Sequence, residues 1–273
     1  MPNTHNDVLR FVTDPDNDIK FVRLAFSDAD GVPKNISVSP DALTAAFRDG
    51  VAFDGRILGD GGGQPLLFPD PETLAALPWR PSHGCVVRLY CDICYADGSP
   101  APCDARASLR RAADGLSDGT EIGVSLDFYL FRSDADGAAT RIPLDAGGYL
   151  DVYPLDRGEN VRREICSYLR EMGVSTSSSF HAYGPGQNTV TLAPAAPAET
   201  ADNIQTLKTV LGAVAGQNGL AASLEPRPLP GTSESMLWLA LRRGGDTEHL
   251  SINPQCNPYA EIEKLLRGAK NRG

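Results

Sequence analysis

Residues 123–131 read GVSLDFYLF, a run that is mostly apolar and aromatic. Its apolar and aromatic residues predict a strand that spans residues 122–132. Ser125 and Asp127 are two positions apart, so on a strand their side chains point to the same face. Taken alone, a strand that ends in FYLF is typical of ordinary sheet core. The stretch therefore predicts a central strand with one carboxylate near its middle.

Outward from this strand, the second part of the chain alternates between predicted strands and helices. We expect strands at residues 122–132, 187–192 and 235–242, and helices at residues 105–113, 159–172, 200–216 and 258–269. Asp104 is the expected N-cap of the first of these helices. The sequence RRGGD at residues 242–246 predicts a turn. This alternation is typical of a layered α/β or α+β domain.

The first part of the chain is predicted to be a small β-rich domain. Residues 19–29 and 34–39 alternate apolar and polar side chains around Asp30-Gly31, which indicates a hairpin. A short helix is expected over residues 42–48 and a long strand over residues 85–95. We place the boundary between the two domains after residue 103.

The charge balance excludes some classes of function. The chain has 25 basic and 35 acidic residues and a formal net charge of -10, with no local cluster of lysine and arginine. Such a surface repels nucleic acid and anionic membranes, so neither is an expected partner. The first 18 residues are polar and acidic and have neither the cationic nor the apolar region of a secretory signal. We therefore expect a cytoplasmic protein.

Four cysteines, Cys85, Cys91, Cys94 and Cys103, lie close together in the sequence. The spacing of Cys91 and Cys94 is that of half a zinc knuckle. However, residues three apart on a strand point to opposite faces, which favours small buried thiols over zinc ligands. A zinc-supported interaction module remains an alternative, and disulfides are not expected in the cytoplasm.

Several short motifs follow one another along the chain. They are Phe53-Asp54-Gly55, Leu67-Phe68-Pro69-Asp70, Gly147-Gly148-Tyr149-Leu150, Arg163-Glu164-Ile165-Cys166, Gly186-Gln187-Asn188, Pro226-Arg227-Pro228 and Asn257-Pro258-Tyr259. Their identity and order resemble the glutamine synthetase family, and the resemblance covers most of the chain. It implies an α+β fold, in which a β-grasp-like N-terminal domain at residues 1–103 precedes a reduced glutamine synthetase-type catalytic α/β domain at residues 104–273. It also implies an internal deletion near residues 243–256.

The resemblance places four metal-binding glutamates of the family on Ser125, Asp127, His181 and Thr189 of this chain. By the same resemblance, a histidine pair falls on Trp238 and Ala240, the Asn-Gly that holds the substrate falls on Ser233-Glu234, and several arginines are missing. A neutral lining does not neutralise ATP and an acyl phosphate. We therefore expect no ATP-dependent ligation, no bound metal and no cofactor.

The residues that remain suggest two functions. Asp127 and His181 are the candidate catalytic pair, because a carboxylate that contacts an imidazole makes a general acid/base without a metal. The expected substrate-binding residues are Ser125, Tyr183, Asn188, Thr189, Trp238, Glu234 and Asp54. The substrate would be an amino-acid-like or acyl-amine metabolite, plausibly of bacterial specialised metabolism.

The alternative is a non-catalytic scaffold that forms a homo-oligomer or a complex with an intact synthetase-like partner. In that interpretation Asp127 and His181 form a structural hydrogen bond, and Trp238 fills vacated volume. Asp54, which in the family reaches into a neighbouring subunit's site, then only caps its own turn.

Overall fold

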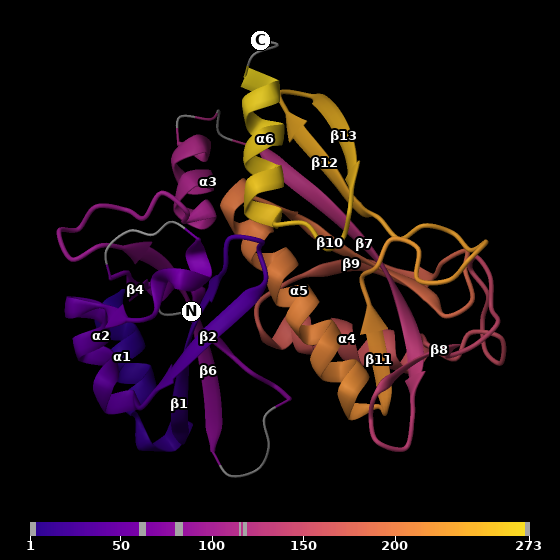
Figure 1. The fold of residues 1–273 in the computed structure, drawn as a ribbon, viewed down its shortest axis with the longest axis horizontal. Helices are drawn as coiled ribbons and strands as arrows, with labels where there is room; N and C mark the ends of the chain where they lie inside the picture. The colour runs from indigo at the N-terminus through magenta and orange to yellow at the C-terminus, as the bar shows by residue number, and fades with distance from the viewer. Residues whose placement is uncertain (1–3, 60–63, 80–83, 115, 117–118, 271–273) are drawn as a thin grey trace. The chain divides into compact units, whose positions relative to one another are not determined.

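A computed structural model describes residues 4–59, 64–79, 84–114, 116 and 119–270 (Figure 1). The chain divides into two compact units, Met1–Asp114 with Asn257–Gly273, and Gly115–Cys256. The sequence analysis placed the boundary after residue 103 and all later residues in the second domain. The structure instead packs α3 (Ala105–Ala113) against α6 (Pro258–Lys270), and both belong to the first unit. Alternation of elements along the chain does not reveal such a return of the C-terminal helix.

The first unit is built on a six-stranded sheet with the order β2-β1-β6-β4-β3, and β5 also pairs with β6. Its strands are β1 Ile19–Ser27, β2 Pro33–Val38, β3 Val51–Ala52, β4 Leu66–Pro69, β5 Ala75–Ala76 and β6 Cys85–Cys94. Its other elements before α3 are α1 His5–Thr13, η1 Pro15–Asn17, η2 Pro40–Ala42, α2 Leu43–Asp49, η3 Gly55–Leu58 and η4 Pro71–Thr73. The expected hairpin is confirmed, because β1 and β2 pair antiparallel on either side of Asp30-Gly31.

Helix α3 is held in the first unit by a cap and by paired charges. Asp104 accepts a hydrogen bond from Ala107 N at 3.0 Å, which confirms the predicted N-cap. The guanidinium of Arg106 lies 2.7 Å from Asp70 and 2.6 Å from Asp92, and Arg110 contacts the same two carboxylates. The two arginine side chains of α3 thus balance the charges of the two carboxylates, Asp70 and Asp92.

The cysteines of β6 do not form a recognisable metal site. Cys91 is buried, Cys85 is exposed, and Cys94 and Cys103 are half-buried. Burial raises the pKa of the Cys91 thiol, which opposes the thiolate form that zinc requires. Among the described residues, the one group of metal-capable side chains close enough to share an ion contains no cysteine.

The second unit is built around β7 (Glu121–Ser133), the predicted central strand. The main sheet has the order β13-β12-β7-β10-β9, and β8 and β11 also pair with β7. The other strands are β8 Ala139–Pro143, β9 Thr176–His181, β10 Gln187–Ala195, β11 Leu220–Ser223, β12 Leu237–Arg243 and β13 Asp246–Ile252. The predicted helices are α4 (Glu159–Glu171) and α5 (Pro197–Gln217).

Helices α4 and α5 cover one face of this sheet (Figure 1). Leu126, Phe128 and Leu130 of β7 are fully buried. Because successive strand residues alternate in direction, Ser125 and Asp127 point to the opposite face. We call the two sides the helix face and the open face. No described helix is long and apolar enough to cross a membrane.

The segment of the expected deletion folds as a hairpin. Strands β12 and β13 pair antiparallel from Leu237 with Ile252 to Arg243 with Asp246. The turn between them is Gly244-Gly245, whose φ angles are 57° and 95°. A two-residue turn with positive φ at both positions is the one that suits a twisted hairpin, and glycine adopts it without strain. The predicted turn is confirmed, and it extends the sheet by one edge strand.

Candidate functional site

The strand register separates the two predicted catalytic residues. Thr189 of β10 pairs with Asp127 of β7, whereas the preceding residue, Asn188, pairs with His181 of β9. Paired residues share a face of an antiparallel sheet, and successive residues point to opposite faces. Asp127 and Thr189 therefore lie on the open face, and His181 and Asn188 on the helix face. The contact between Asp127 and His181 that the candidate catalytic pair requires is not formed.

On the open face, the register brings three predicted ligand-binding residues close to Asp127. Trp238 of β12 pairs with Ser125 of β7, and Ser125 pairs with Thr191 of β10. The hydroxyl oxygens of Ser125 and Thr191 are 2.9 Å apart. Trp238 is 48% exposed. The interpretation in which its ring fills vacated volume in the core is therefore wrong. The open face thus offers hydroxyl groups beside an accessible indole.

Asp127 provides the negative charge of the open face. Its carboxylate accepts hydrogen bonds from Thr189 Oγ1 at 2.7 Å, Trp238 Nε1 at 3.1 Å and Met236 N at 3.2 Å. All three donors are neutral, and no cationic side chain pairs with this carboxylate among the described residues. Burial raises the pKa of Asp127, although the hydrogen bonds from Thr189, Trp238 and Met236 act against the rise.

The loop before β12 is held in place by backbone contacts. Tyr129 Oη donates to Ser233 O at 2.6 Å, and Gln187 Nε2 donates to Glu234 O at 3.2 Å. These bonds place Met236 N against Asp127. The carboxylate of Glu234 instead forms an ion pair with Arg227 at 2.9 Å. The backbone of Glu234, rather than its predicted ligand-binding side chain, therefore supports the open face.

The aromatic residues of the site form a stack at the β9 side of the open face. Phe180 pairs with Thr189 and so shares its face. The ring of Tyr149 lies edge-on to Phe180 at 5.9 Å and stacks on Tyr183 at 4.4 Å with an interplanar angle of 5°. Tyr183 is 69% exposed. Aromatic surface is thus available at the edge of the open face as well as at Trp238.

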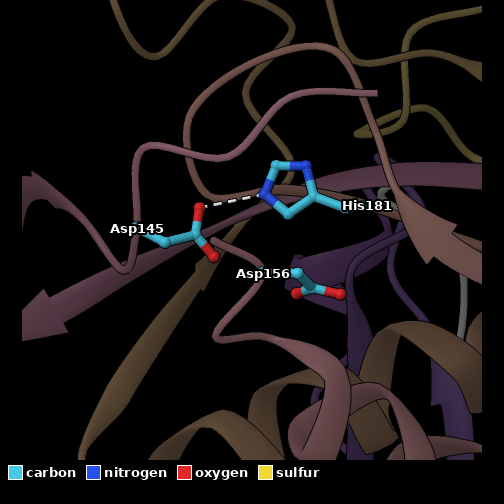
Figure 2. A group of neighbouring side chains, drawn as sticks. All are labelled: Asp145, Asp156 and His181. Atoms are coloured by element: carbon cyan, nitrogen blue, oxygen red, sulfur yellow. Dashed lines mark hydrogen bonds and ion pairs between the residues drawn. The ribbon is translucent and has the colours of Figure 1, made fainter. Parts of the chain in front are cut away.

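His181 on the helix face is fully buried and hydrogen-bonded at both ring nitrogens. Nδ1 lies 2.8 Å from Ala182 O, and Nε2 lies 2.9 Å from Asp145 Oδ1 (Figure 2). Both partner atoms are acceptors, so each nitrogen has to carry a proton. The contacts therefore indicate an imidazolium that is paired with the Asp145 carboxylate.

The pKa shifts agree with this pairing. Burial by itself would raise the pKa of Asp145, but hydrogen bonds from His181, Arg157 N and Gly186 N outweigh burial and lower the pKa to about 2. Burial would likewise lower the pKa of His181. The hydrogen bonds to Asp145 and Ala182 O outweigh it and raise that pKa above the ordinary value.

A second ion pair lies beside the first. Arg162 of α4 donates to Asp156 at 2.6 and 3.0 Å and to Asn188 Oδ1 at 2.5 Å. Asn188 also donates to Gly186 O at 2.9 Å, and its side chain is fully buried. Asn188 therefore fastens the strand to the helix. The prediction that it binds substrate together with Asp127 is wrong, because its side chain lies on the helix face. We call Asp145, Asp156, Arg162, His181 and Asn188 the helix-face network.

Three side chains of this network could together hold a cation: Asp145, Asp156 and His181 (Figure 2). Each offers one ligand atom, a carboxylate oxygen or a ring nitrogen, and these atoms lie within 4.8 Å of one another. All three side chains already have protein partners. Two carboxylates face one guanidinium and one imidazolium, so the charges balance without an ion. We interpret the group as a structural network that fastens the segment containing residues 145–158 to the sheet.

Asp54 belongs to the first unit, apart from the other predicted site residues in the sequence and in the domain division. Its carboxylate accepts a hydrogen bond from Arg56 N at 3.0 Å and caps η3. The Arg56 guanidinium pairs with the same carboxylate and is the main cause that lowers the pKa of Asp54 to about 2. The structure describes Asp54 as the turn cap that the sequence analysis gave as the alternative.

The sequence analysis missed Asp145, Arg162, Thr191 and Tyr149. Asp145 stands two residues before Gly147, and a Cβ at Gly147 would lie 2.9 Å from His181 Nε2. Two adjacent glycines shortly after a short polar residue signal a close backbone approach. Thr191 could have been found, because it lies two residues after Thr189 on the same predicted strand. The partner of His181 could not, since it depends on how a loop folds back.

Two family models match the chain, and their boundaries agree with its two-part architecture. "Glutamine synthetase, beta-Grasp domain" matches residues 18–96, and "Glutamine synthetase, catalytic domain" matches residues 102–239. The fold is therefore α+β, with a β-grasp domain followed by a catalytic-type domain, as predicted. The chain belongs to the glutamine synthetase family.

Similar proteins support this assignment. A glutamine synthetase of Clostridium saccharobutylicum is 36% identical over 281 aligned positions, and the alignment covers 98% of this chain and 63% of that protein. One of Methanosarcina mazei is 36% identical over 239 residues, 85% of this chain and 53% of that protein. The chain thus spans little more than half the length of these relatives.

Solved structures show the same fold. Plasmodium falciparum glutamine synthetase superposes with a TM-score of 0.77 at 16% identity, over 89% of this chain and 55% of that one. An apo structure of GmaS gives a TM-score of 0.71 at 28% identity, over 85% of this chain and 57% of that one. The likeness covers both parts of the chain's sequence but only part of each relative.

Proposed function

We propose that this member of the glutamine synthetase family binds a small amine-bearing metabolite, amino-acid-like or an acyl-amine, on the open face at Asp127 and Trp238. One observation carries the proposal. The Asp127 carboxylate is held by three neutral donors and lacks a cationic partner among the described residues. A ligand ammonium group supplies the missing positive charge, and the half-exposed indole beside it supplies a cation–π and stacking surface.

The lining of the open face supports binding without ATP or a divalent metal. The positions that the family resemblance assigns to metal glutamates hold Ser125 and Thr189 beside Asp127. Ser125 bonds to Thr191 and Thr189 bonds to Asp127, so both hydroxyl groups have protein partners. One carboxylate among hydroxyl groups does not hold the two divalent ions that phosphoryl transfer uses.

Nucleotide binding is the competing function. A solved structure of GmaS, 27% identical to this chain, is a complex with ADP. Isothermal titration calorimetry with ATP and Mg²⁺ separates the two functions. We expect no heat of binding, and a micromolar ATP affinity would refute the loss of ATP-dependent ligation.

The two tryptophans of the chain give a direct test of ligand binding. Trp79 lies in the first unit and Trp238 in the second, so Trp79→Phe leaves Trp238 as the sole indole reporter. Titration with short alkylamines and amino-acid amides should change Trp238 fluorescence. Asp127→Asn should weaken amine binding about tenfold or more, because the ammonium then loses its charged partner.

Two controls make the fluorescence test specific. Alcohols of the same chain length carry no charge and should leave the signal unchanged. Glu234→Gln removes a carboxylate two residues before Met236, whose backbone N–H contacts Asp127. The partner of this carboxylate is Arg227, so the variant should bind amines as the parent does. Equal amine binding in the Asp127→Asn and parent proteins would refute the proposal.

Acid/base chemistry is a second candidate function and would depend on Asp127 alone. The observation in its favour is the pKa of Asp127, which burial raises above the ordinary value of an aspartate. A carboxyl group is a better general acid or base when its pKa lies closer to the working pH. His181 is buried and both of its nitrogens are occupied, so it does not take part in this version. Turnover of a γ-glutamyl amide that persists in Asp127→Asn would rule this candidate out.

Assembly remains a prediction. A homo-oligomer and a complex with a synthetase-like partner were both expected from the family resemblance. Native mass spectrometry of the freshly purified protein would report subunit number and any bound metabolite in one experiment. A monomer without ligand would count against a site shared between subunits.

A further inference from the structure

A surface pocket of about 580 Å³ lies in the second unit and shares no residue with the open face. The ends of β7 and β8 form part of its wall, and residues 144–146, 154, 155 and 157 form the rest. This volume is in the range of pockets that hold small organic ligands. Part of its lining belongs to the segment that the helix-face network fastens to the sheet.

The wall of the pocket is apolar and partly exposed. Ile142 is 59% exposed and Leu155 is 57% exposed, and Pro143, Leu144 and Pro154 line the pocket with them. Large apolar side chains with this exposure are common singly, but here they gather around one hollow. Covering them removes apolar surface from water, which favours a ligand with an apolar body.

Two arginines give the pocket its charge. Arg132 donates to Leu144 O at 3.3 Å through one nitrogen. Arg157 uses its backbone N–H to bond Asp145 at 2.9 Å, and its guanidinium contacts no acidic or polar group among the described residues. A guanidinium has five N–H donors, so both side chains keep donors for a ligand.

The one acidic residue that lines the pocket does not cancel this charge. Asp145 directs Oδ1 to His181 Nε2 and Gly186 N, both at 2.9 Å, and Oδ2 to Arg157 N. Its negative charge is therefore paired with the imidazolium behind the pocket wall. The ligand meets an apolar wall and two guanidinium groups that have no acidic partner among the described residues.

We propose that this pocket binds a small amphipathic carboxylate, with the carboxylate on Arg157 and Arg132 and an aliphatic body against Ile142, Leu144 and Leu155. A planar guanidinium matches a carboxylate with two parallel N–H···O bonds. The apolar wall selects an acid with a hydrocarbon chain over a short one. The inference is independent of any ligand at the open face.

The experiment uses octanoate as the probe and calorimetry as the measurement, with the whole chain at low ionic strength. Octanoate should bind, and acetate should bind much more weakly because it lacks the apolar body. Octanol should also bind much more weakly, because it keeps the apolar body but has no charge for the two arginines. Absence of octanoate binding, or equal binding of octanoate and octanol, overturns the proposal.

Matched variants locate the binding. Arg157→Gln should weaken octanoate binding about tenfold or more, as expected for the loss of a charged hydrogen-bond pair. Arg170→Gln removes the same charge from α4 away from the pocket lining and should change the affinity by less than about twofold. Asp127→Asn should have no effect, which keeps this result separate from the open-face proposal. Circular dichroism checks that each variant is folded, and an unchanged affinity in Arg157→Gln contradicts the proposed site.

Discussion

The two faces of the sheet in the second unit each hold a carboxylate, and the two carboxylates have opposite surroundings. Asp145 on the helix face is paired with the His181 imidazolium at 2.9 Å and accepts hydrogen bonds from three backbone N–H groups. Asp127 on the open face accepts three hydrogen bonds from neutral donors. The first charge is balanced by the protein, and the second is not.

This difference separates a structural role from a binding role. A buried charge that is fully paired stabilises one arrangement of the chain and leaves no donor or acceptor for a ligand. A carboxylate that only neutral groups support keeps its attraction for an external cation. Sequence alone made Asp127 and His181 candidates for one site, and the fold assigns them to these two different roles.

The largest expected effect is on the helix face. His181→Gln removes the charged partner of Asp145 and should lower the free energy of unfolding by about 3–5 kcal/mol. Urea unfolding followed by Trp238 fluorescence in the Trp79→Phe protein measures the second unit selectively. A loss no larger than that of Asp127→Asn would contradict the division between the two faces.

Raising the pH should remove part of the same stabilisation. The pKa of His181 is raised in the folded state, so its contribution is complete below the unfolded pKa of about 6.5 and is lost as the pH rises through the folded pKa. The pKa of Asp145 is lowered to about 2, so its contribution is present above about 3.9 and is lost as the pH falls toward 2.

The free energy of unfolding should therefore be highest between about pH 4 and 6.5 and should decrease at higher pH. The same urea measurements, repeated across this range, test the direction. The decrease at high pH should be absent in His181→Gln. If the parent and the variant lose stability equally above pH 6.5, His181 is not the titrating group.

A steric change tests the packing around His181 without removing a charge. A Cβ at Gly147 would lie 2.9 Å from His181 Nε2, whereas a Cβ at Gly148 would meet only Asp151 Oδ2 at 3.7 Å. Gly147→Ala should therefore lower the free energy of unfolding by about 1–3 kcal/mol. Gly148→Ala is the matched control and should have a smaller effect. Equal losses in both variants would contradict the close packing.

The smallest effect on stability is expected on the open face. Asp127→Asn should change the free energy of unfolding by about 1 kcal/mol or less. An amide oxygen can accept from Trp238 Nε1 and Met236 N, and the amide group can donate to Thr189 Oγ1, so each bond can be retained. Urea unfolding gives the change, and a loss above about 3 kcal/mol would show that the Asp127 charge is structural.

Much of the secondary structure could be predicted because it depends on local patterns. The hairpin around Asp30-Gly31, the cap at Asp104 and the turn at Gly244-Gly245 were all predicted correctly. Each follows from the backbone preferences of a few adjacent residues. The short strands β8, β9, β11 and β13 were missed because their stability comes from pairing with β7, β10 and β12.

The candidate site was predicted only in part. Four predicted residues do lie together on the open face: Ser125, Asp127, Thr189 and Trp238. The spacing along one predicted strand grouped Ser125 with Asp127, and the family resemblance added the other two. His181 and Asn188 were wrongly grouped with them. A shift of one residue in strand register moves every side chain to the other face of the sheet. The register between two strands that are far apart in sequence cannot be predicted from the residues of either strand alone.

The family, the central strand and the carboxylate at Asp127 can be recognised from the amino-acid sequence, because motifs and alternation are properties of neighbouring residues. The face that each side chain occupies, the carboxylate that is neutralised and the arginines that lack an acidic partner follow from the folded chain. Pairing a charge or burying a ring depends on groups that are distant in sequence. His181 found its partner in Asp145, 36 residues away, and Asp127 was left with an unbalanced charge.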